Sequence, residues 1–191
     1  MSRRITFVRQ RLIPGPVLVF SLGLCLAPLA AQAAQAAADQ AREAVGLFVQ
    51  SCLKYVEDPV DLQAWIKATP QLRKFPADQA KAFLEGKRGD VWSAENDAGL
   101  FALVVFADDT CTVVAQQASA DQVSLVFSEY VRKKRLPLDK IGDRKEFIRG
   151  IDQREEIYRS NDGHLLYEVV LMTSKSLRAD AQAVLTTRPN R

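Results

Sequence analysis

The chain has 191 residues, of which 26 are Lys or Arg and 23 are Asp or Glu, giving a net charge of +3. This length is sufficient for one domain with a substantial hydrophobic core. Four of the arginines lie within the first 11 residues, and the remaining chain is close to neutral. Nucleic-acid binding requires a concentrated positive surface, so the charge balance does not favour it.

The first 33 residues have the pattern of a cleaved secretory signal peptide. A basic start precedes the apolar run 17–26 ("VLVFSLGLCL"), and Ala31-Gln32-Ala33 is a small-x-small cleavage pattern, with a similar one at 34–36. The apolar run is about half the length that crosses a bilayer, so no transmembrane anchor is expected after cleavage. Leu24 precedes Cys25 where a lipoprotein motif has a small residue, which argues against a lipid anchor. The sequence therefore predicts export to the periplasm.

Removal of the signal leaves two cysteines, Cys52 and Cys111, and an oxidising compartment favours their pairing. Apolar residues at helical spacing in 39–56 place Cys52 on the buried face of a helix. If Asp108-Asp109 is a two-residue hairpin loop, Phe106 faces Cys111, and strand alternation directs Cys111 to an apolar sheet face. We therefore expect a disulfide between helix and sheet. The alternative, a redox-active or metal-binding thiol, lacks a CxxC spacing and nearby histidines.

The remaining elements follow from periodicity and turn residues. Short helices are expected at 60–68 and 77–85, and Ser119 is expected to cap a helix over 120–133. The expected strands are 91–94, 100–106, 110–116, 144–151, 154–160, 164–174 and a final edge strand at 181–187. This order predicts a single α+β domain over 39–187, in which N-terminal helices and one inserted helix pack on an antiparallel sheet. Residues 188–191 are expected to form a loose tail.

Catalytic chemistry has few candidates in this sequence. His164 is the only histidine, which leaves no histidine-based triad or zinc site, and no phosphate-binding glycine loop or cofactor motif is present. The carboxylate pairs Asp108-Asp109 and Glu155-Glu156 lie in a turn and on opposite faces of a strand. Glu95 and Asp97 could form a shallow surface with Trp92. We therefore assign no catalytic, metal or cofactor residue, and take Trp92, Glu95 and Asp97 as a candidate binding surface.

Several motifs between residues 45 and 127 resemble a family of small exported proteobacterial proteins and lipoproteins with no assigned activity. The similarity rests on Cys52-Leu53, Phe83-Leu84-Glu85-Gly86, Gly89, Trp92, the run 100–105 and "TCTVVA" at 110–115. The resemblance implies structural roles for Cys52, Cys111 and Trp92. It implies no activity, and because a lipoprotein motif is missing, membrane tethering is not carried over.

These observations predict an exported, non-enzymatic protein of the periplasm that binds a protein or a cell-envelope component. An inhibitor or immunity-type protein is the sharper form of this hypothesis. The alternative is a carboxylate-based cell-envelope hydrolase. An acidic pair at the floor of a pocket beside Trp92 would favour the hydrolase, and a sheet with an exposed apolar patch would favour binding.

Overall fold

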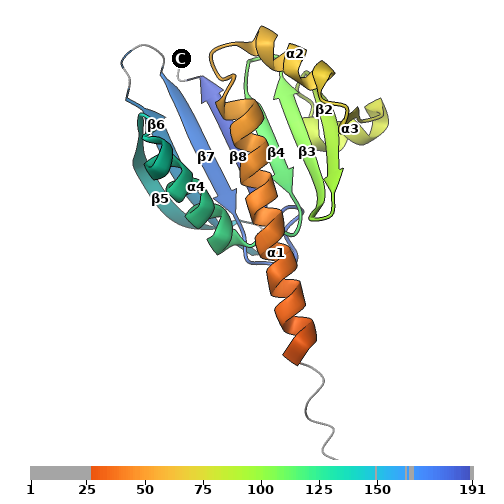
Figure 1. Cartoon of the computed structure of the whole chain (residues 1–191), viewed down its shortest axis with the longest axis vertical. Coiled ribbons are helices and arrows are strands. Elements are labelled where there is room, and N and C mark those ends of the chain that lie inside the picture. The colour runs from red at the N-terminus through yellow and green to blue at the C-terminus, as the bar shows by residue number, and fades with distance from the viewer. Residues whose placement is uncertain (1–26, 149, 162, 164–165, 190–191) are drawn as a thin grey trace, which may run out of the picture.

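The computed structural model describes residues 27–148, 150–161, 163 and 166–189, so the expected signal region up to residue 26 and His164 lie outside the described residues. The described chain forms an antiparallel sheet of eight strands with helices on both faces (Figure 1). The strand order is β1-β2-β3-β4-β8-β7-β6-β5. The predicted α+β class is confirmed.

The helices are α1 (Ala27–Phe48), the π-helical segment η1 (Val49–Leu53), α2 (Pro59–Ala68), α3 (Ala77–Leu84) and α4 (Ala120–Lys134). The strands are β1 (Leu72–Lys74), β2 (Gly89–Asn96), β3 (Gly99–Phe106), β4 (Cys111–Ala115), β5 (Leu138–Ile148), β6 (Ile151–Ser160), β7 (Tyr167–Thr173) and β8 (Ala183–Pro189). Side-chain caps begin two of the helices: Asp58 accepts from the Asp61 amide ahead of α2, and Ser119 accepts from the Gln122 amide ahead of α4.

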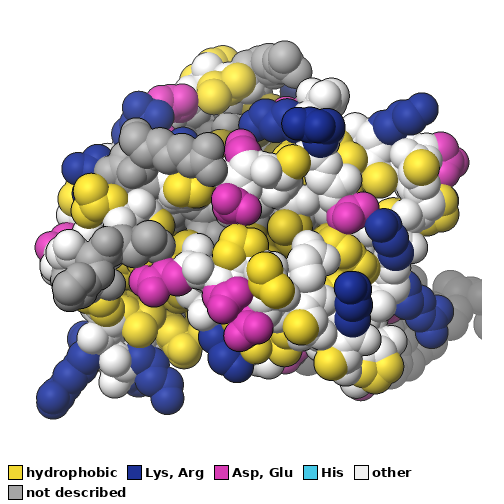
Figure 2. Space-filling model, turned by 90° about the horizontal axis from the view of Figure 1, so that it is seen from above, with side chains coloured by type: hydrophobic (Ala, Val, Ile, Leu, Met, Phe, Trp, Pro, Cys, Tyr) yellow, Lys and Arg dark blue, Asp and Glu magenta, His cyan; other side chains and the backbone are white. Residues whose placement is uncertain are grey.

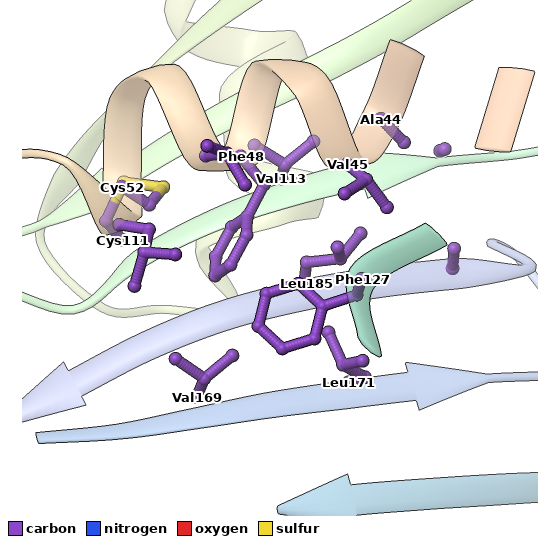
Figure 3. Close-up of a cluster of buried hydrophobic side chains, with 14 of the residues drawn as sticks. Ala44, Val45, Phe48, Cys52, Cys111, Val113, Phe127, Val169, Leu171 and Leu185 are labelled. Carbon is purple, nitrogen blue, oxygen red and sulfur yellow. A yellow bond between two sulfur atoms is a disulfide. The ribbon is translucent and has the colours of Figure 1, made fainter. Parts of the chain in front are cut away.

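One face of the sheet carries the main core. Helix α1 lies across β4 and β8, and α4 lies beside it over β7 (Figure 1). Phe48 of α1, Phe127 of α4 and Tyr158 of β6 form a chain of edge-on aromatic contacts with centroid separations of 6.0 and 5.1 Å. Figure 3 shows these helices closing on the apolar side chains of β4, β8 and β7. The opposite face is covered by α3, which packs on β2 and β3.

A disulfide joins Cys52 in η1 to Cys111 at the start of β4, as predicted (Figure 3). The expected hairpin register was wrong by one residue, because Val105 and not Phe106 faces Cys111. The loop has three residues, 107–109: the Phe106 carbonyl accepts from the Asp109 amide, and Asp109 adopts a left-handed φ of 67°. A type I turn followed by a left-handed residue is a common three-residue hairpin loop. Cys111 still faces the helices, and it shares that face with Leu103 and Val105.

The C-terminal strand also differs from its expected position. Strand β8 is central, between β4 and β7, and is not an edge strand. It runs to Pro189, so Arg188 belongs to the sheet and not to a loose tail. The short edge strand β1 lies where no strand was expected, and β5 begins at Leu138, six residues before the expected start at residue 144. In both places the polar sequence lies on an edge strand, where alternation of apolar residues is weak.

Candidate binding surface

The structure does not bring Trp92, Glu95 and Asp97 together. Trp92 is only 7% exposed and packs in the main core on the helix-covered face. Glu95 is three residues further along β2, and alternation places it on the opposite face. Asp97 lies in the turn between β2 and β3. The expected surface is therefore corrected: Trp92 has the structural position implied by the family resemblance, and the two acidic residues occupy separate sites.

Each of these acidic residues borders its own open depression. Glu95 lines one of about 360 Å³ with Pro70, Gln71, Arg73 and Ser93. Asp97 lines another of about 410 Å³ between α1 and the β2–β3 turn, together with Asp39, Arg42, Glu43, Asn96 and Ala98. Among the described residues, no group of three metal-ligating side chains is present. Neither depression encloses a buried titratable group that would suit acid–base chemistry.

Gln40 of α1 fixes the turn that carries Asp97. Its buried side-chain amide donates to the Ala98 carbonyl at 3.2 Å, and its side-chain oxygen accepts from the Gln117 amide at 2.6 Å. Gly99 follows with a φ of +142°, and a Cβ there would lie 2.3 Å from Nε2 of Gln40. The positive φ and the close approach of Gln40 therefore both favour glycine where the turn meets α1.

The most elaborate polar cluster lies between α4 and the β5–β6 pair, and it is centred on Glu156. The Glu156 side chain is 3% exposed, and one of its oxygens, Oε2, lies 2.8 Å from Lys140 Nζ and accepts from the Tyr158 hydroxyl at 3.1 Å. Its Oε1 lies 3.2 Å from Arg154 Nη1 and accepts from the Ser124 hydroxyl. Asp143 pairs with the same two cations, at 2.6 Å from each. One buried carboxylate thus joins helix α4 to two strands.

This cluster is arranged for structure and not for proton transfer. Burial acts to raise the pKa of Glu156, but hydrogen bonds from Lys140 and Ser124, with the charges of Lys140 and Arg154, hold that pKa below its ordinary value of 4.5. Desolvation acts to lower the pKa of Lys140, but its bonds to Asp143 and Glu156 raise that pKa overall. At neutral pH the carboxylate is ionised and Lys140 is protonated, so neither is a free general base beside Ser124.

The second face of the sheet is open over β4, β8, β7, β6 and β5. Within the described ranges, α3 is the only helix on this side, and it contacts β2 and β3. We call the open part the uncovered face. Strand register places three rows of side chains on it: Val114, Val184, Met172, Glu155 and Arg144; then Thr112, Thr186, Val170 and Ile157; then Arg188, Glu168, Arg159 and Asp139.

The outer row of the uncovered face holds a fixed pair of arginines. Glu168 accepts from Arg159 Nη2 and from Arg188 Nη2, both at 2.8 Å, and the two arginines remain about half exposed. The pKa of Glu168 lies below its ordinary value. The hydrogen bond from Arg159 is the main cause and Arg188 adds to it, whereas burial acts in the opposite direction. In the next row the hydroxyls of Thr112 and Thr186 lie 3.0 Å apart. The uncovered face therefore combines oriented guanidinium groups with a Thr, Val and Ile strip.

Sequence reasoning missed both charged clusters. Their residues are dispersed over 140–188, and the signal that could have found them is alternation of charges in "DRKEF" and "DQREEIYR", where every second residue shares a face. In the view of Figure 2 basic side chains are scattered among acidic and hydrophobic ones, and do not gather in one block.

In the part of the chain that the structure describes, no helix combines the length and hydropathy needed to span a bilayer. No protein-family model and no curated protein matches this sequence.

Proposed function

We propose that this chain is an exported, non-enzymatic protein of the periplasm that binds a partner protein through the uncovered face of its sheet. The observation that carries the proposal is that five neighbouring strands have no helix on one side within the described chain. Sheets normally bury an apolar face against another layer. The same strands carry Val, Ile and Met side chains on the open side, which suits burial against a partner.

Export is supported by the first turns of α1. Residues 30–36 are exposed, and Ala37 is the first position that bonds to the domain, through its carbonyl and the Ser119 amide at 2.9 Å. Figure 1 shows this end of α1 projecting beyond the sheet. The described side chains ahead of the expected cleavage position, those of residues 30–33, are all exposed. The buried Cys52–Cys111 disulfide suits an oxidising compartment.

The chemistry of the uncovered face favours a flat protein surface that presents acidic groups beside an apolar strip. Arg159 and Arg188 share one glutamate, so the trio carries a net charge of +1. The exposed parts of the guanidinium groups are held in fixed orientations, and arginine is frequent among the residues that dominate protein interfaces. Thr186 and Ile157, both half-buried, lie in the next row and supply the neutral strip, in which Val170 between them is only 7% exposed.

The hydrolase alternative has less support. A glycosidase pairs two carboxyl groups across a substrate, one of them with a pKa raised by burial. Glu95 and Asp97 border different depressions, and the acidic residues that join Asp97, namely Asp39 and Glu43, lie on the exposed side of α1.

We also propose that this chain is related to the family of exported proteins that its motifs resemble. The Cys52–Cys111 bond and the buried Trp92 support this proposal.

The proposal is tested by site-specific photo-crosslinking in cells that export the chain. A photoreactive side chain replaces Met172, which lies on the uncovered face and is 37% exposed, and in a control it replaces Leu125 on α4, which is 48% exposed. We expect position 172 to give one discrete protein adduct that position 125 does not. The partner is then identified by mass spectrometry and titrated, as a purified protein, with the wild-type chain and with Met172→Lys. Equal adducts at both positions, or unchanged affinity of Met172→Lys, would contradict the proposal.

A further inference from the structure

The β5–β6 hairpin extends beyond the sheet to which it belongs. Pairing between β5 and β6 continues to Ile148 and Ile151, whereas pairing between β6 and β7 stops at Arg154 and Thr173. Residues 145–148 and 150–153 therefore form a two-stranded extension, which we call the hairpin arm. Ser174 contacts the base of the hairpin arm: the Ser174 hydroxyl donates to the Asp152 carbonyl at 2.8 Å.

Large apolar side chains are exposed on the hairpin arm. Phe147 is 72% exposed and Ile148 is 42% exposed. Natural sheets protect projecting strands with charged residues, and an exposed aromatic side chain at such a position has no benefit for the isolated fold. These two side chains are therefore candidates for contact with another molecule.

The base of the hairpin arm is held rigidly by the charged cluster described above. Arg154 of β6 donates to Asp143 of β5 through Nε at 2.8 Å and Nη2 at 2.6 Å. Arg144 of β5 pairs with Glu155 of β6, and Glu156 anchors the same strand to α4 through Ser124. A binding element that is already ordered before binding loses less conformational entropy in the complex.

The two sides of the hairpin arm indicate the shape of its partner. Alternation places Phe147 on the α4 side of the ribbon, and Ile148 with its neighbour Ile151 on the opposite side. A flat surface covers one side of a ribbon only, whereas a cleft with two walls covers both. The sequence 145–153 carries balanced charges, Lys145 and Arg149 against Glu146 and Asp152, which does not favour an anionic lipid surface.

We propose that the hairpin arm inserts into an apolar cleft of a partner protein, with Phe147 as the anchoring side chain. This is a second binding element, distinct from the uncovered face, and it has the projecting form expected of an inhibitor or immunity-type protein. Aromatic anchors in pockets contribute a large share of interface affinity. The hairpin arm needs no catalytic group of this chain for such a role.

The test places a photoreactive side chain at Phe147 in the exported chain, with Ile141 as the matched control, because Ile141 lies on β5 outside the hairpin arm and is 48% exposed. We expect a discrete protein adduct at position 147 only. The partner, identified from that adduct and purified, is titrated with the wild-type chain, Phe147→Ala and Ile141→Ala. We expect Phe147→Ala to weaken binding at least about tenfold and Ile141→Ala to weaken it less than about twofold.

Thermal unfolding of both variants checks that they fold. No adduct at 147, equal losses of affinity in the two variants, or crosslinking of position 147 to phospholipid would overturn the proposal. Co-flotation of the wild-type chain, but not of Phe147→Ala, with phosphatidylglycerol vesicles would likewise replace it by membrane binding. The uncovered face is tested separately at position 172, so failure of the hairpin arm leaves the binding function itself standing.

Discussion

Strands β2 and β3 are buried on both faces, in the main core on one side and under α3 on the other, whereas within the described residues β6 and β7 have a helix, α4, on one face only. Both sets of strands contain long apolar stretches. The first set uses both of its faces for the core of the domain. On the face of the second set that no described helix covers, Met172 is 37% exposed and Arg159 is about half exposed, whereas Val170 is 7% exposed.

The two regions also keep their shapes by different means. Around β2, β3 and β4 the shape depends on a disulfide and on the close fit of Gly99 against Gln40. Around β5, β6 and β7 it depends on the carboxylates of Glu156 and Glu168, each held between cations. A covalent bond and close packing thus hold the first region, whereas ion pairs hold the second and fix Arg159 and Arg188 on the uncovered face.

Removing the disulfide tests the first region with the largest expected effect. The bond spans 59 residues, and replacing both cysteines by alanine should reduce the free energy of unfolding by about 4 kcal/mol, because the unfolded chain gains freedom. The melting temperature should fall by roughly 10 °C, measured by calorimetry. Crosslinking from Met172 at a temperature where the variant is folded should be unchanged. A melting temperature equal to that of wild type would contradict the structural role.

Glu156→Gln tests the charged cluster of the second region. It leaves Lys140 and Arg154 facing a neutral group at a buried position, and we expect a loss of about 2 kcal/mol, since both cations also reach solvent. The neighbouring Glu155→Gln breaks only the more exposed pair with Arg144, and should cost less than about 1 kcal/mol. Urea unfolding measures both variants. Equal losses would mean that burial of Glu156 has no energetic importance.

Gly99→Ala tests the fit at the β2–β3 turn. The added Cβ meets the Gln40 amide at 2.3 Å in a backbone conformation that favours glycine, so we expect a loss of about 1.5 kcal/mol. Gly150→Ala is a control for a positive φ without a close neighbour, because its φ is 81° and no neighbouring atom lies within 4 Å of the position that the added methyl group would take. Thermal unfolding measures both variants. If both variants lose the same stability, the fit against Gln40 is unimportant.

The dependence of stability on acid pH tests the second region, and we expect the smallest effect here for each carboxylate. The pKa values of Glu156 and Glu168 lie below 4.5 in the folded chain, so their contribution to stability is present above about pH 4.5 and is lost as the pH falls through the folded values. Stability measured from pH 6 to pH 3 should therefore decline in the lower half of this range. The stability of Glu168→Gln should decline less steeply over the same pH range than that of the wild type. An unchanged slope in that variant would show that Glu168 is not paired in solution.

The helices and the disulfide were predictable because each has a local signal. Apolar spacing identified α4, and a cysteine at the right position in an apolar helix face identified the bond to Cys111. The order of the strands had no local signal: β8 reads as a short ordinary strand, and its central position follows from long-range pairing with β4 and β7.

The candidate site was the least predictable part, because its residues converge only through register. Arg159, Glu168 and Arg188 lie on three strands, and nothing in their immediate neighbourhoods of sequence distinguishes them from ordinary surface charges. Trp92 was expected to form a shallow surface with Glu95 and Asp97 because they are close in sequence, but it lies in the main core on the helix-covered face. A sequence shows which residues share a strand face, and the fold decides which face is left open.

The oxidation rate of Met172 tests the central claim most directly. The chain has two methionines, Met1 in the expected signal and Met172 on the uncovered face, so one residue reports on that surface without any substitution. Hydroperoxide is applied to intact cells and to the purified protein, and formation of the sulfoxide is followed by mass spectrometry. If a partner protein covers the uncovered face, Met172 oxidises several-fold more slowly in the periplasm than in the purified chain at the same oxidant exposure. Equal rates would contradict the account.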